Sequence, residues 1–382
     1  MTQISHTKVK NLGNLTAIAE QFASQKHVVD IQLLGNGNIN DTYLVTQDPQ
    51  DTNDGEKFIL QRINTRVFSQ PALVMQNMRI FTEHARARLQ RNPLRCDRRW
   101  EVPPVLMTQD DRDYYIDSGG SFWRAIGFIG NSYSLDAIQN LEHAREVGYA
   151  LGTFHSLIGD LPPKKLVDTL EGFHITPRYL RHYEEVIAKA DNNSASKSPE
   201  VQYCLRFISD RADWAHVLED AKAKGKLPLR LMHGDPKVNN VMIDTTTQQA
   251  VSMIDLDTVK PGLVHYDIGD CLRSGCNPLG EETDRLESVC FESDLCQAIL
   301  LAYLAETREF LTEHDYDYMY DAIRLLAFEL GLRFFTDRLA GNVYFKVAHP
   351  EHNLTRALVQ FKLVESIESQ EATIRTIIQD VS

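Results

Sequence analysis

Apolar and polar residues alternate along several short stretches in the first third of the chain. Residues 28–34 and 57–63 alternate with a period of two, which predicts strands whose side chains point to opposite faces of a sheet. Residues 71–89 instead place apolar side chains three and four positions apart, which predicts a helix packed on that sheet. Other predicted elements here are a short amphipathic helix over 11–27, a strand that opens at Leu44, a hairpin formed by 102–107 and 112–117, and an extended apolar stretch over 121–129.

The remaining two thirds of the chain carry mainly the helical period. Two short apolar runs, 241–243 and 251–254, flank a turn rich in Thr and Gln, and they predict one hairpin within this helical part. The predicted helices are 140–158, 293–308, 316–335 and a long helix that follows the polar loop 190–199 and ends near residue 224. A strand-rich part followed by a mainly helical part indicates an α+β fold.

The composition is that of an acidic globular protein. The chain has 382 residues, 43% of them hydrophobic, and a formal net charge of −13 at pH 7. Nucleic acids and anionic membranes attract clustered Lys and Arg side chains, so this charge argues against both as partners. The six cysteines form no Cys-x-x-Cys pair and are expected as free thiols. With no signal-peptide pattern and no apolar run of membrane length, a cytoplasmic protein is expected.

One stretch concentrates the chemistry of the chain. His233, Asp235 and Asn240 form the pattern H-x-D-x-x-x-x-N, and Asp255 ends the second strand of the predicted hairpin. Phosphoryl transfer needs such a set: a carboxylate orients and deprotonates a hydroxyl, and an amide and a second carboxylate hold Mg²⁺ against the nucleotide phosphates. The hairpin would bring Asn240 and Asp255 to one metal ion, and His233 is interpreted as a brace for the loop. A polar loop that keeps its acids for structural reasons is the alternative interpretation.

This stretch resembles the catalytic and metal-binding segments of the kinase-like small-molecule phosphotransferases, the class of aminoglycoside and choline kinases. Residues 37–43, 256–270 and 332–364 are similar to the N-acetylhexosamine 1-kinases in particular. The resemblance implies a two-lobed protein-kinase-like fold. It places a β-rich nucleotide-binding lobe at 1–130 and a larger, mainly helical lobe for catalysis and substrate binding at 131–382.

The resemblance assigns roles to the residues of the catalytic stretch. Asp235 is the expected general base or hydroxyl-orienting group. Lys237 is expected near the transferred phosphate, with a surface lysine as the alternative. Asn240 and Asp255 are the expected Mg²⁺ ligands. Asp257 would lie on the same face as Asp255 in an extended chain, where it would bind a second metal or support the site.

Contacts to ATP are expected in the first lobe. The small-residue turn between the first two strands can cover phosphates with backbone N–H groups, although ordinary hairpin turns look the same. Where many kinases place a phosphate-pairing lysine on the third strand, this chain has Gln61 and Arg62. Side chains alternate along a strand, so only one of the two can face the phosphates, and bidentate pairing favours Arg62. The candidate nucleotide-binding residues are Gly35, Gly37, Asn38, Asn40, Thr42, Gln61, Arg62 and Phe128, the last in a stretch that leads to an adenine-reading hinge or belongs to the core.

Contacts to the acceptor are expected from two segments. Asp270 and Arg273 lie three residues apart on one predicted helix face, where they form an internal ion pair or line a sugar pocket. Sugar hydroxyl groups need carboxylates and amides directed at them, which makes Asp270 a candidate ligand. In the tail, Arg333, Asp337 and Tyr344 are candidates for sugar contact, with an exposed loop and helix cap as the alternative interpretation.

The function implied by the resemblance is ATP- and Mg²⁺-dependent phosphorylation of a hexosamine, expected to be an N-acetylhexosamine phosphorylated at its 1-hydroxyl. Two alternatives stay open. The acidic surface also suits a kinase of another sugar, an amino alcohol or an aminoglycoside. The missing kinase lysine motivates a non-catalytic nucleotide-binding sensor, against which Asp235, Asn240 and Asp255 argue. The sequence is compatible with a monomer and with a homodimer.

Overall fold

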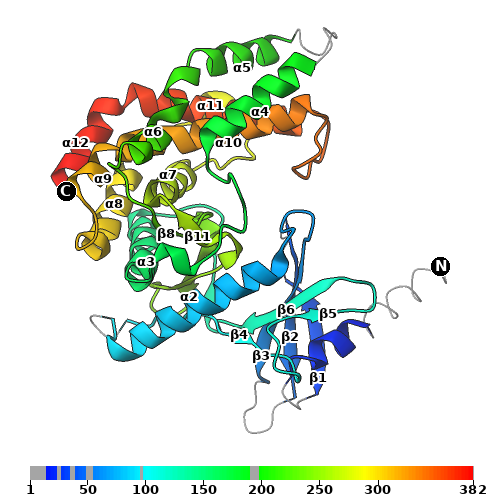
Figure 1. Ribbon diagram of the computed structural model, residues 1–382. Coiled ribbons are helices and arrows are strands. Elements are labelled where there is room, and N and C mark those ends of the chain that lie inside the picture. Colours follow the sequence, from blue (N-terminus) through cyan, green and yellow to red (C-terminus); the bar gives the residue numbers. More distant parts are fainter. Residues whose placement is uncertain are drawn as a thin grey trace. The chain divides into compact units, whose positions relative to one another are not determined.

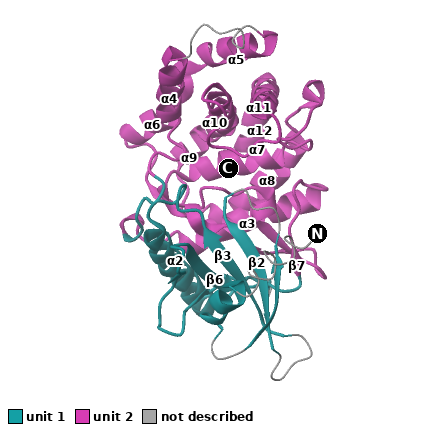
Figure 2. Ribbon diagram, turned by 90° about the vertical axis from the view of Figure 1, so that its right-hand side faces the viewer, with its two compact units in different colours: residues 1–131, 165–170 teal, residues 132–164, 171–382 magenta. Residues whose placement is uncertain are grey.

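The computed structural model describes residues 14–23, 27–34, 39–48, 55–94, 98–189 and 198–381. The chain divides into two compact units, which Figure 2 shows in different colours. The first comprises residues 1–131 together with 165–170, and the second comprises 132–164 together with 171–382. The chain therefore enters the second unit and then returns briefly to the first.

The first unit is built on an antiparallel sheet of six strands (Figure 1). The bounds of these strands are β1 Val28–Leu33, β2 Asp41–Gln47, β3 Lys57–Ile63, β4 Val105–Leu106, β5 Tyr115–Ile116 and β6 Phe122–Gly127. They lie in the order β1-β2-β3-β6-β4, and β5 also pairs with β6. The strands predicted over 28–34 and 57–63 correspond to β1 and β3.

The predicted hairpin between residues 102–107 and 112–117 is wrong. β4 pairs with Ala125 and Ile126 of β6, whereas β5 pairs with Phe122 and Trp123 of the same strand. The two short strands therefore follow one another along one edge of β6. Alternation of side chains tells which faces a strand presents, but it does not tell which strand is its partner.

Apolar clusters cover both faces of this sheet. On one face, Leu60 of β3 packs with Ile18, which lies in a segment that is helical over residues 14–20. On the other face, Ile63 of β3 packs with Met75 of α2 (Pro71–Arg91). Odd- and even-numbered residues of β3 thus face opposite sides, which decides the surroundings of Gln61 and Arg62.

The second unit is mainly helical. Its helices are α3 Leu141–Ile158, α4 Thr176–Lys189, α5 Pro199–Ser209, α6 Val217–Ala223, α7 Val264–Gly275, α8 Ser293–Thr307, α9 Glu313–Asp317, α10 Met319–Leu339, α11 His352–Ser369 and α12 Glu371–Val381. α10 packs against α4, α7 and α11 (Figure 1). α3 packs closely on α8 because Gly148 lacks a side chain: a Cβ atom there would lie 2.1 Å from the Ile299 carbonyl oxygen.

The long helix predicted to end near residue 224 is broken in two. α5, a 3-10 turn over Ala212–His216 and α6 follow one another instead. A tertiary contact lies at the break, where the Arg211 guanidinium forms an ion pair with Glu368 of α11 at 2.7 Å. The polar loop expected at 190–199 lies largely outside the described residues.

Two small sheets support the catalytic stretch within the second unit. One pairs β8 (Arg230–Met232) with β11 (Lys260–Gly262), and the other places β9 (Val241–Asp244) between β10 (Ala250–Met253) and β7 (Ser132–Tyr133). The β9–β10 pair is the hairpin predicted from the two apolar runs. A small antiparallel sheet in one unit and a mainly helical second unit confirm the α+β prediction. No helix in the described part of the chain is long and apolar enough to cross a bilayer.

Candidate active site

The catalytic stretch connects β8 to β9. After Met232 ends β8, a loop carries the chain to a 3-10 turn over Val238–Asn240, from which β9 begins. The Ile254 N–H donates to the Asn240 carbonyl at 2.9 Å and so ties the end of this loop to the residue that follows β10. The ends of two paired strands therefore hold the loop and Asp255 together.

Asp267, in the first turn of α7, holds the backbone of this loop. Its carboxylate accepts hydrogen bonds from the His233 N–H at 2.6 Å, the Gly234 N–H at 2.8 Å and His155 Nε2 at 2.7 Å. The side chain is fully buried. Burial alone would raise the pKa of Asp267, but the hydrogen bond and charge of His155 lower it overall. The carboxylate is thus ionised in the interior and fixes the loop in one conformation.

The His233 ring braces the loop from a second direction. Its Nε2 lies 3.0 Å from the Ile254 carbonyl oxygen, and its Nδ1 accepts the Asp235 N–H at 3.2 Å. Burial lowers the pKa of His233, so the ring is neutral at physiological pH. A neutral ring with its proton on Nε2 suits both partners, which agrees with the bracing role expected of His233.

Gly234 allows the loop to turn close to β11. Its φ angle of +87° lies in the region that favours glycine, and a Cβ atom there would lie 2.8 Å from the Thr258 carbonyl oxygen. Its own carbonyl accepts a hydrogen bond from His174 Nε2 at 2.7 Å. Both the backbone conformation and the close approach therefore require glycine.

Replacing Gly234 with alanine is expected to lower the free energy of unfolding by about 1–3 kcal/mol and to lower turnover as well. The added Cβ must push the loop away from Thr258 and so displace Asp235. Urea unfolding and initial rates of ADP release measure the two effects. Gly225→Ala is the matched control, because Gly225 has a φ angle of +71° but no atom within 4 Å of its Cβ position. Equal turnover of the two variants would contradict this prediction.

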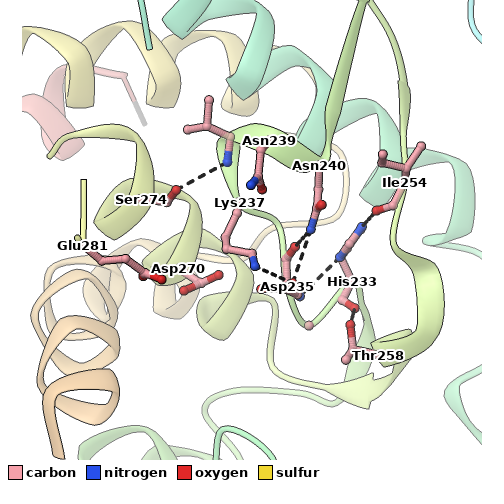
Figure 3. A network of polar contacts seen from close by, with 12 residues as sticks. His233, Asp235, Lys237, Asn239, Asn240, Ile254, Thr258, Asp270, Ser274 and Glu281 are labelled. Carbon is pink, nitrogen blue, oxygen red and sulfur yellow. Dashed lines mark hydrogen bonds and ion pairs between the residues drawn. The ribbon is translucent and has the colours of Figure 1, made fainter. Parts of the chain in front are cut away.

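The Asp235 side chain is partly exposed and touches two other residues of the loop (Figure 3). Its Oδ2 lies 3.1 Å from Lys237 Nζ and 3.3 Å from Asn240 Nδ2. Burial would raise the pKa of Asp235, but the positive charge of Lys237 lowers it overall. In turn the Asp235 carboxylate raises the pKa of Lys237. At neutral pH the loop therefore presents an ionised carboxylate beside an ammonium group.

Asn240 and Asp255 offer hard oxygen donors at the neighbouring ends of β9 and β10. The Asn240 Nδ2 donates to the Asp235 carbonyl at 2.7 Å, so its Oδ1 is the atom suited to a metal. Asp255 is exposed and directly follows Ile254. In the described residues, no three His, Cys, Asp or Glu side chains gather closely enough to hold a metal ion. The pair fits a cation such as Mg²⁺, which takes few protein ligands and completes its shell with water and phosphate oxygens.

Asp257 does not share a face with Asp255, and this expectation is wrong. Asp255 adopts a left-handed conformation with φ 61°, and Leu256–Thr258 form a 3-10 turn. Alternation of side chains holds only in an extended chain, so it does not apply across this turn. Asp255 is exposed, whereas Asp257 is 2% exposed. Metal binding by Asp257 stays a prediction, and its burial favours the supporting role.

Asp270 and Arg273 of α7 form the internal ion pair that their spacing allows. Arg273 Nε donates to Asp270 Oδ1 at 2.8 Å, and Arg273 Nη1 lies 3.3 Å from Glu281. Burial would lower the pKa of Arg273, but these two acids raise it overall. Figure 3 shows Asp270 and Glu281 beside Lys237, and both acids raise the pKa of that lysine. Asp270 thus lies next to the catalytic loop, and its contact with an acceptor stays a prediction.

Arg333 of α10 lies among aromatic rings. Its guanidinium carbon is 4.9 Å from the centre of the Tyr179 ring, 5.3 Å from that of Phe173 and 5.5 Å from that of Phe345. Such cation–π contacts stabilise a guanidinium away from bulk water. Burial opposes its charge, but Tyr179 and nearby acids, Asp270 among them, raise the pKa of Arg333. Arg333 is thus a charged group within electrostatic reach of Asp270.

Asp337 anchors the loop that follows α10. Its carboxylate accepts the N–H groups of Val343, Tyr344 and Phe345 at 2.9, 2.8 and 3.0 Å, and Asn353 Nδ2 at 2.9 Å. These four hydrogen bonds use the acceptor capacity of the carboxylate. The geometry therefore favours the loop-and-cap alternative for Asp337. Tyr344 is 53% exposed, and its contact with an acceptor stays a prediction.

In the first unit, Gln61 and Arg62 face opposite sides of the sheet. Gln61 Oε1 accepts hydrogen bonds from Arg124 Nε at 2.9 Å and Nη2 at 2.6 Å, and Gln61 Nε2 donates to Thr42 Oγ1 at 3.0 Å. Arg62 is exposed and forms an ion pair with Asp41 on the neighbouring strand. The preference for Arg62 as the phosphate contact stays a prediction. Arg124, which is 1% exposed, is a further cation beside Gln61 that the sequence reasoning missed.

Two of the other predicted nucleotide contacts, Asn40 and Phe128, lie within the described residues. Asn40 is 8% exposed, and its Oδ1 accepts the Asn64 N–H at 2.9 Å, which holds the end of the turn before β2. Phe128 is partly buried and directly follows β6. Gly35, Gly37 and Asn38 lie outside the described residues.

The sequence model of one protein family spans this catalytic region. The phosphotransferase enzyme family, APH, matches residues 30–287, from β1 past Asp270. The chain belongs to this family. The expectation of an enzyme that transfers a phosphoryl group to an alcohol is thereby confirmed.

Solved structures agree with this family in their fold. An aminoglycoside phosphotransferase from Alicyclobacillus acidocaldarius is 17% identical, with 95% of this chain and 96% of that chain covered and a TM-score of 0.61. A microcompartment-associated aminopropanol kinase is 17% identical, with coverages of 94% and 98% and a TM-score of 0.59. A spectinomycin phosphotransferase, solved with ADP and spectinomycin, is 11% identical, with coverages of 91% and 94% and a TM-score of 0.53.

Two residues of this phosphotransferase that hold its catalytic loop from other segments were not predicted from the sequence. Asp267 belongs to segment 256–270, which resembles the N-acetylhexosamine kinases. Its function in holding the loop is evident only from its burial and its three hydrogen bonds. His174 is 4% exposed and stands in no motif of the sequence. The one local signal for Asp267 is an acid in the first turn of a helix, which is common at helix N-termini for other reasons.

Proposed function

We propose that this phosphotransferase is an ATP- and Mg²⁺-dependent kinase that phosphorylates an N-acetylhexosamine at its 1-hydroxyl. The observation that carries the kinase part is the ionised Asp235 carboxylate, 3.1 Å from Lys237 Nζ. The end of its loop is tied to Ile254, the residue before Asp255. The sugar part rests on the resemblance of residues 256–270 and 332–364 to the N-acetylhexosamine kinases.

In the proposed reaction, Asp235 accepts the proton of the acceptor hydroxyl as its oxygen attacks the γ-phosphorus of ATP. The bond from that phosphorus to the β–γ bridging oxygen breaks, and ADP leaves. Lys237 stabilises the negative charge of the phosphoryl group in transit. Asn240 and Asp255 would hold Mg²⁺, which neutralises charge on the phosphate oxygens when it is bound.

Nucleotide use is supported by the chain's family and by one relative of similar fold. The spectinomycin phosphotransferase was solved with ADP, the product that ATP leaves after phosphoryl transfer. In this chain, Asn40, Thr42, Gln61, Arg62 and Phe128 stay the proposed nucleotide contacts among the described residues. Arg124 joins them as a candidate, because its guanidinium donates twice to Gln61, which stands on the strand where many kinases have a lysine.

The charge around α10 favours a neutral acceptor over a cationic one. Arg273 is buried and already pairs with Asp270 and Glu281. Arg333 is a partly buried cation whose pKa Asp270 helps to raise. A choline, aminopropanol or aminoglycoside ammonium group placed here would meet Arg333 and find these acids occupied. Sugar hydroxyl and amide groups carry no charge and can bond to Arg333, Asp270 and Tyr344.

The test is ADP release from Mg²⁺-ATP with a panel of acceptors. The panel contains N-acetylglucosamine, N-acetylgalactosamine, glucosamine, glucose, galactose, choline and an aminoglycoside. Fast release with an N-acetylhexosamine, with phosphate at the anomeric position by NMR, is the expected result. Release only with another acceptor would keep the kinase and exclude the N-acetylhexosamine. ATP binding without release on any acceptor would favour the sensor alternative.

Replacing Arg333 with alanine is expected to raise the KM for the acceptor by about 10–100-fold, the loss of one or two hydrogen bonds from a charged donor. The KM for ATP should be unchanged. Arg324→Ala is the matched control, because Arg324 lies on the same helix but contacts different residues. Its guanidinium carbon lies 4.2 Å from the centre of the Trp214 ring. Initial rates at varied acceptor concentration measure the effect. Equal acceptor KM values for the two variants would exclude Arg333 as the contact.

A further inference from the structure

His174 connects the catalytic loop to α10. Its Nε2 lies 2.7 Å from the Gly234 carbonyl oxygen, and its Nδ1 lies 2.9 Å from Glu329 Oε1. Glu329 Oε2 accepts the Thr176 hydroxyl at 2.7 Å. The partner atom of each ring nitrogen is an oxygen that accepts hydrogen bonds, so each nitrogen donates a proton. Burial would lower the pKa of His174, but the Glu329 carboxylate raises it overall, which agrees with a doubly protonated ring.

The same connection reaches the candidate acceptor residue Arg333. Glu329 lies one helical turn before Arg333 on α10, and both Glu329 and Asp270 contribute to the raised pKa of Arg333. The ring of Phe173, the neighbour of His174, has its centre 5.3 Å from the guanidinium carbon of Arg333. Two adjacent residues thus contact the catalytic loop and the candidate acceptor residue.

The backbone at His174 is held in an uncommon conformation. Its φ angle is +63°, a value that costs free energy for a residue other than glycine. The ring is buried, and its plane is stacked on Tyr266 at 5.6 Å between ring centres. A fold that only had to fill this volume would not need a histidine here, whereas a bond to the Gly234 carbonyl needs a donor at this place.

We propose that His174 is a positioning residue for phosphoryl transfer: it fixes the Gly234–Asp235 peptide by its bond to the Gly234 carbonyl, and Glu329 orients its ring. The inference rests on the proposed role of Asp235. Asp267 holds the N–H groups of His233 and Gly234, while His174 holds the carbonyl of Gly234. Asp267 therefore holds the two peptides that precede Gly234, and His174 holds the next peptide, which carries Asp235. An error of about 1 Å in the place of Asp235 would cost about 10²-fold in rate.

Two conservative substitutions separate positioning from simple packing. The His174→Gln side chain can place an N–H group where Nε2 stands and so reach the Gly234 carbonyl. The shorter His174→Asn side chain can place one only where Nδ1 stands, next to Glu329. We expect His174→Asn and His174→Ala to lower kcat by about 10²-fold with the KM for ATP unchanged, and His174→Gln to recover most of that loss.

His265→Ala is the matched control for the loss of a buried histidine. His265 is 1% exposed, and its Nε2 lies 2.9 Å from the Asp315 carbonyl oxygen, away from the catalytic loop. The control should lower stability and keep kcat. Equal kcat values for the Asn and Gln variants would overturn the proposal, as would a control that loses as much kcat as His174→Ala.

A second measurement does not depend on activity. Amide hydrogen exchange over residues 233–240 should be faster in His174→Asn and His174→Ala than in wild type, and close to wild type in His174→Gln. Unchanged exchange in all three variants would overturn the proposal. A wild-type protein that transfers phosphate to no acceptor of the panel would instead overturn the proposed function, and the exchange experiment would still decide whether His174 holds the loop.

Discussion

Replacing Asp235 with asparagine is expected to lower kcat by about 10²- to 10⁴-fold and to leave the fold intact. Asparagine has the shape of aspartate, and it can still accept a hydrogen bond from Asn240 Nδ2, which lies 3.3 Å from Asp235 Oδ2. It cannot take the proton of an acceptor hydroxyl. It also removes the charge that raises the pKa of Lys237. The variant should therefore lose proton transfer but keep its stability, because the Asp235 side chain is partly exposed and is not part of the apolar core.

The experiment compares the variant with wild type by ADP release and by urea unfolding. Asp317→Asn is the matched control, because Asp317 is an exposed acid of α9 that forms a local ion pair with His314 at 3.2 Å. The control should keep both kcat and stability. A folded Asp235→Asn protein with wild-type turnover would falsify the assignment of Asp235 as the base.

Replacing Asp267 with alanine is expected to lower the free energy of unfolding by about 3–5 kcal/mol, the usual loss when one partner of a buried charged pair is removed. The substitution leaves the N–H groups of His233 and Gly234 and the ring of His155 without their acceptor, in a place that water does not reach. Turnover should fall too, because the loop that carries Asp235 loses its main support.

Urea unfolding at neutral pH measures this loss. Asp321→Ala is its control, because Asp321 is an acid of α10 that forms a local pair with Arg324 at 3.0 Å. A decrease of less than about 1 kcal/mol in the free energy of unfolding is typical of an exposed ion pair and would contradict the prediction.

The pH dependence gives a second test of Asp267. Its pKa in the folded protein is lowered, so its carboxylate adds stability above the ordinary aspartate pKa of about 3.9, and this contribution disappears as the pH falls through the lowered value. The alanine variant has no such contribution to lose. The stability gap between wild type and variant should therefore narrow below about pH 4, and a constant gap would count against an ionised Asp267.

Elements with a strong local pattern were predictable from the sequence. Residues 57–63 have a period of two because β3 is covered on both faces, by Ile18 on one side and by Met75 on the other. The pattern of His233, Asp235, Asn240 and Asp255 was also readable, because its residue types stand at short spacing and the β9–β10 hairpin joins Asn240 to Asp255.

Partners far apart in the sequence were not predictable. The strands β4 and β5 lie at the places that their side chains indicate, but both pair with β6, since alternation specifies a face and not a neighbour. The helix expected to run to residue 224 breaks near Arg211, which pairs with Glu368 across 157 positions of sequence. The prediction that Asp255 and Asp257 share a face assumed an extended chain. Asp255 instead has a left-handed backbone and is followed by a 3-10 turn, which the local sequence does not indicate.

The sequence by itself determined the fold class, the family and the side chains able to carry out the chemistry, because each depends on residue types at short spacing. Only the tertiary structure decided what holds the catalytic loop. Asp267 reaches it from α7, and His174 reaches it across 60 positions and brings Glu329 from α10. Hydrogen bonds between distant segments leave no period in the sequence, so the positioning of Asp235 is a property of the folded chain.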